Sequence, residues 1–189
     1  MEVLQKILDP AENSTGGGSA SAIAGAMAAA LAAMVARLSI GKEGMQPADF
    51  YEAHNARLVR LADELLEGAR LDSDAFAAVL AGFRLPKDTQ EQKTARVAAI
   101  QNAWIQSTRI PLENAQRCSE AQELANELVG RSNTSAASDL TCALYLARAG
   151  GLGCLDNVTA NLEMIKDERI ATDLQAQALS TRERLDRYN

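Results

Sequence analysis

The chain has 189 residues with a formal net charge of −6, and 47% of its residues are hydrophobic although only 4% are aromatic. Its 36 alanines favour closely packed helices, while 12 glycines and 4 prolines are too few for an all-β sandwich. The apolar content excludes a disordered chain, and the acidic balance excludes a basic surface for nucleic acid or anionic membranes. We expect an all-α fold in a single domain over residues 1–189.

A long alanine-rich helix is predicted over about residues 19–38, after a polar loop over residues 9–18. Alanines fill most of this helix, and its larger apolar side chains have the spacing of one helical face. A helix of this composition is buried on nearly all sides, which a small bundle cannot achieve alone. We therefore expect a homodimer that forms through alanine-rich helix faces. The larger apolar residues are Ile23, Met27, Leu31, Met34, Val35 and Leu38.

The same region raises the question of a membrane span. Residues 15–36 carry no charge and are numerous enough to cross a bilayer. Only Ile23, Leu31 and Val35 strongly favour insertion, and acidic residues instead of basic ones precede the run. We therefore expect neither a membrane partner nor a secretory signal.

Two further helices are predicted between residues 47 and 85. Pro47 is favourable at the start of the first of them. Asp72, with the polar residues that follow it, has the character of a helix cap. It predicts the start of a short helix that ends near Leu85, ahead of Pro86.

The second half of the chain continues the helical pattern. Thr89 and Gln92 have the spacing of a capping box, and Pro111 either kinks the helix that they begin or starts a further one. Residues 130–138 are predicted as a polar loop, and the glycines within residues 150–153 as a break between two helices. With a charged C-terminal helix, the bundle has about seven helices.

The first segment that could bind a ligand is Gly16, Gly17, Gly18 and Ser19, which open the alanine-rich helix. Backbone N–H groups at the positive end of a helix bind carboxylates and phosphates, and bare backbone admits a flat ring. Alternatively, the glycines are a flexible leader and Ser19 is only the helix cap. The segment is neither a Rossmann fingerprint nor a Walker loop, since no strand precedes it and no Gly-Lys-Ser/Thr follows.

Two other polar groups allow both a structural and a functional interpretation. Asn133, Ser138 and Asp139 lead into an apolar helix. Ser138 or Asp139 could be only a helix cap, or Asp139 could project into a cleft as a general base or hydrogen-bond acceptor. Asn157 and Asn161 lie one helical turn apart on one face, although asparagine is a poor helix former, so we expect a polar role for them.

The remaining candidates are weaker on local grounds. Asp72 and Lys87 could each be an ordinary solvated charge. His54 is the only histidine, so a Ser-His-Asp triad, a Cys-His pair or a histidine metal site would all depend on it. It lies in a helix stripe, and we expect it to be structural. The three cysteines lack metal-type spacing and fit reduced thiols, from which we expect a cytoplasmic protein.

Seven segments follow one another along nearly the whole chain in the order of one enzyme family. They are GGGSASAIAGAMAAALAAMVARLSIGK at residues 16–42, DSDAF at 72–76, LPKDTQEQKTAR at 85–96, AIQNA at 99–103, PLENA at 111–115, SNTSAASDL at 132–140 and NVTANLEMIKD at 157–167. Together they resemble the cyclodeaminase/cyclohydrolase family of folate enzymes. That family includes the C-terminal half of formiminotransferase-cyclodeaminase and stand-alone methenyltetrahydrofolate cyclohydrolases.

The resemblance implies an all-α homodimer that acts on a tetrahydrofolate one-carbon unit without a metal or another cofactor. It implies Asp72 and Asp139 as catalytic carboxylates, with Lys87 as a proton donor or anion contact. The substrate-binding residues that it implies are Gly16, Gly17, Gly18, Ser19, Asn133, Ser138, Asn157 and Asn161.

For the reaction, the resemblance implies hydrolysis of 5,10-methenyltetrahydrofolate to 10-formyltetrahydrofolate. The first alternative is a cyclodeaminase, which closes the same one-carbon bridge with release of ammonia, and the second is a non-catalytic folate-binding or assembly module. The chain lacks a formiminotransferase half, which favours the cyclohydrolase. It also departs from the family at residues 13–15, where prolines are usual, and at Ser132, where glycine is usual.

Overall fold

The computed structural model describes residues 2–12 and 14–188, and it contains helices and no strand in these ranges. The expected all-α fold is confirmed, with six α-helices in the described residues where about seven were expected. The helices are α1 (Glu2–Leu8), α2 (Gly17–Ser39), α3 (Ala48–Arg84), α4 (Gln90–Glu127), α5 (Ala137–Leu162) and α6 (Glu168–Leu185). Short 3₁₀ turns cover Thr134–Ala136 and Asp186–Tyr188.

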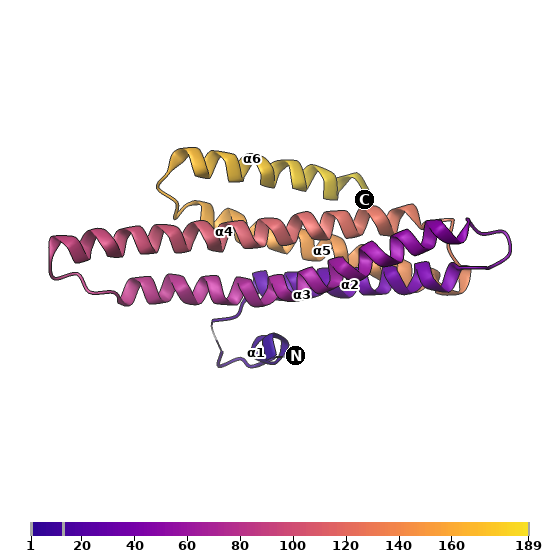
Figure 1. Cartoon of the computed structure of the whole chain (residues 1–189), viewed down its shortest axis with the longest axis horizontal. Coiled ribbons are helices and arrows are strands. Elements are labelled where there is room, and N and C mark those ends of the chain that lie inside the picture. The colour runs from indigo at the N-terminus through magenta and orange to yellow at the C-terminus, as the bar shows by residue number, and fades with distance from the viewer. Residues whose placement is uncertain (1, 13, 189) are drawn as a thin grey trace.

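Helices α2 to α5 form the body of the molecule, in which α2 packs against α3, α4 and α5. Helix α6 lies along the outer side of α4 and α5, and α1 packs beside α2 and α3 (Figure 1). The C-terminal part of α3 and the N-terminal part of α4 extend past the other helices as a hairpin, seen at the left of Figure 1. The N-terminal end of α2 therefore lies at the base of this hairpin, where four helices meet.

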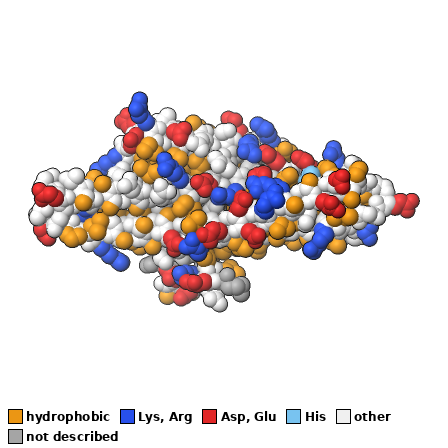
Figure 2. Space-filling view, viewed as in Figure 1, with side chains coloured by type: hydrophobic (Ala, Val, Ile, Leu, Met, Phe, Trp, Pro, Cys, Tyr) orange, Lys and Arg blue, Asp and Glu red, His pale blue; other side chains and the backbone are white. Residues whose placement is uncertain are grey.

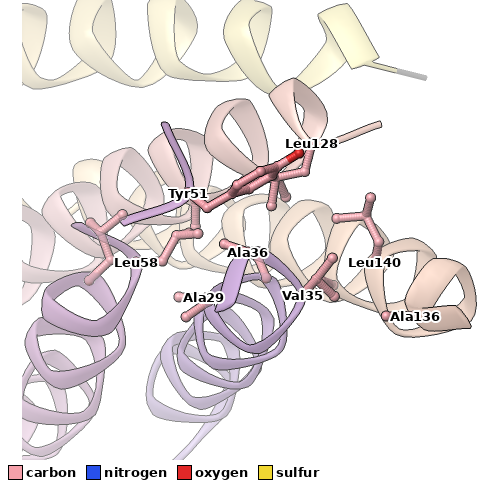
Figure 3. Close-up of a cluster of buried hydrophobic side chains, with 14 residues drawn as sticks. Ala29, Val35, Ala36, Tyr51, Leu58, Leu128, Ala136 and Leu140 are labelled. Atoms are coloured by element: carbon pink, nitrogen blue, oxygen red, sulfur yellow. The ribbon is translucent and has the colours of Figure 1, made fainter. Parts of the chain in front are cut away.

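Small side chains allow the central helices to approach closely. Ala29 and Ala36 of α2 lie in a core that also receives Tyr51 from α3, Leu128 and Leu140 (Figure 3). At Gly150, α5 lies close against the backbone of α2. A Cβ atom there would lie 2.6 Å from the Ser21 carbonyl oxygen and 2.9 Å from the Gly25 nitrogen, both backbone atoms that cannot turn aside.

Two predicted helix breaks are absent, and Pro111 does not start a further helix, which together lower the helix count. Helix α3 continues through Asp72 and Ser73, because their side chains turn inward to bonds with other helices and loops instead of capping a new helix. Helix α4 contains Pro111 in its interior, so no new helix begins there. The glycines at residues 150–153 lie within α5 and serve close packing.

Other boundaries agree with the sequence. Thr89 and Gln92 form the capping box of α4, in which the Thr89 side chain accepts from the Gln92 N–H and the Gln92 side chain accepts from the Thr89 N–H. Helix α3 ends at Arg84, next to the expected Leu85. Local sequence signals therefore predicted the turn between α3 and α4 correctly.

Helix α2 is long and apolar enough to cross a membrane, and it is the single such helix among the described residues. More than half of its most apolar window is buried inside the bundle, as in the core helix of a soluble protein.

Acidic and basic side chains gather over the middle of the face formed by α3 and α4 (Figure 2). There Arg57 forms two 2.6 Å hydrogen bonds to the carboxylate of Glu120.

Candidate active site

A pocket of about 220 Å³ opens at the N-terminal end of α2. Four helices and the loop that precedes α2 contribute to its wall, so residues far apart in sequence meet there. The lining residues are Ser14, Gly16, Gly17, Gly18, Asp72, Phe76, Ser107, Asn157 and Asn161. Five of the residues predicted from sequence are among them, namely Gly16, Gly17, Gly18, Asn157 and Asn161, together with the predicted carboxylate Asp72.

Asp72 is the charged side chain of this wall. It lies in the interior of α3 and is 8% exposed. The Ser19 hydroxyl donates a 2.9 Å hydrogen bond to Asp72 Oδ2, and the Asn157 amide donates a 3.5 Å one to Oδ1. Burial raises the pKa of Asp72 above its usual value, because the carboxylate loses water, and the hydrogen bonds from Ser19 oppose this rise in part. A carboxyl group with a raised pKa can both hold and release a proton closer to neutral pH.

Gly18 allows α2 to approach these polar side chains. A Cβ atom on Gly18 would lie 2.1 Å from Asn157 Nδ2 and 2.6 Å from each carboxylate oxygen of Asp72. Gly16 and Gly17 differ, because a Cβ atom on either would meet no other atom within 4 Å. Their backbone is exposed in the pocket, at a helix end where N–H groups have no partner within the helix.

Ser19 does not act as the cap of α2. The N-cap is Gly16, and it makes no side-chain capping bond. The Ser19 hydroxyl is buried and is directed to Asp72. The loop before α2 is held in place separately, by a 2.9 Å hydrogen bond between the hydroxyls of Thr15 and Ser73. The expectation that Ser19 caps the helix is therefore wrong.

Asn157 and Asn161 lie one turn apart on α5, as predicted, and both line the pocket. The Asn161 amide donates a 2.6 Å hydrogen bond to the Ser107 carbonyl oxygen in α4. The Ser107 hydroxyl is buried and has no hydrogen-bond partner among the described residues. Sequence reasoning missed Ser107, which lies in the middle of a helix with no motif around it. It also missed Phe76, which was quoted within the DSDAF segment but not proposed as a site residue.

The structure places four predicted residues away from this pocket within one chain. Asn133 lies at the opposite end of α2, where its side chain donates to the Leu38 carbonyl oxygen and its N–H donates to the Ser39 hydroxyl. Ser138 and Asp139 follow it in the first turn of α5. Helix α2 has 23 residues, so this end is about 30 Å from Gly18. Lys87 lies in the exposed turn of the α3–α4 hairpin.

The first turn of α5 also settles one structural alternative. Its N-cap is Ala136, without a side-chain capping bond, so neither Ser138 nor Asp139 caps the helix. Asn133 caps the preceding 3₁₀ turn by accepting a 3.1 Å hydrogen bond from the Ser135 N–H. Asp139 is half-buried and makes no hydrogen bond or ion pair with another residue in the described part of the chain. Its predicted catalytic role remains a prediction.

His54 has a structural environment. Its Nδ1 lies 2.7 Å from the Phe50 carbonyl oxygen and its Nε2 lies 2.8 Å from a carboxylate oxygen of Glu127. Both ring nitrogens are thus occupied, and His54 is not among the residues that line the pocket. This agrees with the expectation that His54 is structural, and its bond to Glu127 joins α3 to α4.

The assembled pocket combines a buried carboxyl group, two amide side chains and bare backbone at a helix N-terminus. The amides and backbone can orient a flat polar ring, and the carboxyl group can transfer a proton or stabilise a cationic centre. The lining residues include no lysine, arginine or histidine, so they provide no side-chain cation for an anionic group of a ligand.

Comparisons with known proteins match most of the chain to one enzyme family. The formiminotransferase-cyclodeaminase family model matches residues 2–180. The chain is 34% identical to a methenyltetrahydrofolate cyclohydrolase from Methylorubrum extorquens over 179 residues, which cover 91% of the chain and 85% of that protein. It is 33% identical to the formimidoyltransferase-cyclodeaminase of Rattus norvegicus over 161 residues, or 81% of the chain but only 28% of that longer protein.

The fold has a counterpart in the crystal structure of a formiminotetrahydrofolate cyclodeaminase from Thermotoga maritima. The two superpose with a TM-score of 0.73 at 24% identity, over 92% of this chain and 87% of that one. This likeness shows the shared fold alone. The family model, which spans nearly the whole chain, and the relatives above 30% identity show more: the chain belongs to the formiminotransferase-cyclodeaminase family of folate enzymes.

Proposed function

We propose that the protein is a methenyltetrahydrofolate cyclohydrolase, which converts 5,10-methenyltetrahydrofolate to 10-formyltetrahydrofolate. The observation that carries this proposal is the buried carboxyl group of Asp72 beside the open backbone of Gly16 and Gly17. The similarity to a cyclohydrolase over 85% of that protein's length supports it.

The reaction adds water to the electrophilic carbon that bridges N5 and N10, and the bond from this carbon to N5 then breaks. Water loses a proton as it attacks, and N5 must gain one as it leaves. We propose that Asp72 accepts the first proton and returns it to N5, while the hydroxyl proton of the tetrahedral intermediate is released to solvent as the carbonyl forms. This task suits a carboxyl group whose pKa is raised by burial. Water and proton transfer are sufficient for these steps.

Asn157 and the N-terminal end of α2 have complementary tasks in this proposal. The Asn157 amide, which donates to Asp72 Oδ1, fixes the orientation of the carboxyl group. The N–H groups at the start of α2 face the pocket from the positive end of the helix dipole. They therefore suit a carbonyl oxygen of the pterin ring or an anionic group of the substrate.

A cyclodeaminase activity is the second candidate. Relatives that are named formimidoyltransferase-cyclodeaminase are almost as similar, with 33% identity in Rattus norvegicus against 34% for the cyclohydrolase. In that reaction N10 attacks a formimino carbon on N5 and ammonia leaves after protonation. The same carboxyl group would supply a proton to the amino nitrogen that leaves as ammonia, so the pocket suits both reactions.

We also propose that the protein is a homodimer. The outer face of α2 is apolar and partly exposed, with Met27 48% and Leu38 44% exposed, and the face carries no charge before Arg37. Helix α2 has 23 residues and is about 35 Å long, so a second copy can cover this apolar face along its length.

The function is tested by offering the purified protein each substrate separately and following the methenyl chromophore. The cyclohydrolase proposal predicts loss of the chromophore from methenyltetrahydrofolate faster than in buffer, without release of ammonia. Formation of the chromophore from formiminotetrahydrofolate, with ammonia, would show the cyclodeaminase instead. Binding of folate without either conversion would contradict both and favour a non-catalytic module. Light scattering tests the dimer, and a stable monomer of 20.1 kDa at micromolar concentration would contradict it.

A further inference from the structure

Ser107 lines the pocket from α4, and its hydroxyl group is not used by the fold. The residue is 3% exposed, and its hydroxyl has no hydrogen-bond partner among the described residues. A buried polar group without a partner costs free energy, so folded proteins contain few of them. In the wall of a pocket, such a group indicates a partner that arrives with the ligand.

A serine within a helix has a local alternative, because its hydroxyl can donate to the carbonyl oxygen four residues earlier. Other helical hydroxyl groups of this protein make that bond, namely those of Ser39, Thr94, Thr108, Thr141, Thr159 and Thr181. The Ser107 hydroxyl does not. Rotation about one bond moves a serine hydroxyl among three staggered positions, so it can turn to a molecule in the pocket.

The polar groups of the pocket form two pairs, one helical turn apart along α5. At one end the Asn157 amide donates to Asp72, and at the other the Asn161 amide donates to the Ser107 carbonyl oxygen. Side chains one turn apart are separated by about 5–6 Å at their Cβ atoms, which is close to the length of a fused two-ring system. A pterin with N5 at Asp72 therefore places its far edge at Ser107.

This far end presents hydrogen-bond acceptors. The Asn161 NH₂ group is bonded to protein, and no described residue donates to its amide oxygen, which is left to accept from a ligand. The Ser107 hydroxyl can also accept. The pyrimidine edge of a pterin, with its N3–H and 2-amino group, carries hydrogen-bond donors. The two sets are complementary.

We propose, on the basis of the folate function proposed above, that the Ser107 hydroxyl accepts a hydrogen bond from the 2-amino group of the pterin. Ser107 is then a substrate-binding residue that selects rings with this amino group. By holding the far edge of the ring, it keeps the one-carbon unit beside Asp72. A site built to bond a polar group discriminates strongly against a ligand that lacks it.

Calorimetric titration with two stable quinazoline analogues of folate tests this assignment without any turnover. One analogue carries the 2-amino group, and in the other a methyl group of similar size replaces it. Wild type should bind the amino analogue about tenfold more tightly, a difference of about 1.4 kcal/mol. Ser107→Ala should lose this preference by weakening only the amino analogue. A retained preference, or equal weakening of both analogues, would overturn the proposal.

Ser119→Ala is the matched control, because Ser119 is also buried in α4 with an unpartnered hydroxyl but does not line the pocket. It should leave the preference unchanged. Denaturant unfolding tests for a structural role. Ser107→Ala removes no hydrogen bond within the described protein, so its unfolding midpoint should equal or exceed that of wild type. A lower midpoint would show that the hydroxyl supports the fold and would overturn the assignment.

The outcomes separate this assignment from the proposed function. A retained preference in a Ser107→Ala protein that still turns over methenyltetrahydrofolate would overturn only the role of Ser107. The expected loss of preference in a protein without turnover would refute only the proposed reaction. Wild type that binds neither analogue would contradict both.

Discussion

A group of polar residues lies at each end of α2, and the two groups have different surroundings. At the N-terminal end, Ser19 is buried and bonded to Asp72, under a wall built by four helices. At the C-terminal end, Asn133 is bonded to backbone and Asp139 has no partner within the described chain. The comparison shows what burial by neighbouring helices does to a polar residue. It removes water from the Asp72 carboxyl group and thereby raises its pKa.

The largest effect is expected at the enclosed end. Asp72→Asn keeps the shape and an acceptor for Ser19 but loses the exchangeable proton, so turnover should fall by about 10²- to 10⁴-fold in the methenyl assay. Asp74→Asn is the control, because Asp74 is two residues away, exposed and paired with Arg70. Near-normal turnover of a folded Asp72→Asn protein would remove the carboxyl group from the mechanism.

The glycine backbone should affect binding more moderately. Gly17 lines the pocket and has open space where its side chain would be, so Gly17→Val places a branched side chain in the volume meant for the ligand. Folate affinity should weaken at least tenfold, or by about 1.4 kcal/mol, in a calorimetric titration. Unchanged affinity in a helical, well-folded variant would show that the ligand does not approach this turn.

Substitutions at the adjacent glycines Gly17 and Gly18 should have different effects on the free energy of unfolding. Gly18→Ala forces a methyl group against Asn157 and Asp72 and should lower the free energy of unfolding by about 1–3 kcal/mol, as overpacking of a core does. Gly17→Ala meets nothing and should leave stability unchanged or raise it by up to about 1 kcal/mol. Denaturant unfolding of both variants measures the difference, and equal stabilities would contradict the close approach.

The smallest effect concerns pH. The pKa of Asp72 is raised in the folded protein, so the native state binds more protons than the unfolded chain above the ordinary value of 3.8. The contribution of Asp72 to stability is therefore most favourable in acid and is lost as pH rises through its native pKa. Asp72→Asn should become more stable relative to wild type across this window. A stability difference independent of pH would contradict the raised pKa.

Much of the enclosed site follows from sequence. Gly16 to Ser19 and the pair Asn157 and Asn161 were unusual for helical segments, and the family resemblance added Asp72. The structure brings these residues together. Residues inside helices were harder to predict from the sequence. Asp72 was expected at a helix start because aspartate favours caps, but tertiary bonds to Ser19 keep it within α3. Local propensity is a weak preference that such contacts override.

Other features had no sequence signal. Ser107 is an ordinary residue of α4 by its neighbours, and only the packing of α4 against α5 makes its carbonyl oxygen the acceptor for Asn161. Gly150 was expected to break a helix, yet it lies within α5 because α2 passes too closely for any side chain. Such contacts depend on which helices become neighbours, and local patterns in one sequence do not reveal this.

The central claim is that the one-carbon unit of a folate reacts beside Asp72. A crystal structure of the protein with bound 10-formyltetrahydrofolate tests it most directly. The account predicts the formyl group within hydrogen-bond reach of the Asp72 carboxyl group, about 2.6–3.2 Å, with the ring against Gly16 and Gly17. A folate bound elsewhere, for example on the α3–α4 hairpin near Gly82 and Ala103, with the Asp72 pocket unoccupied, would contradict it.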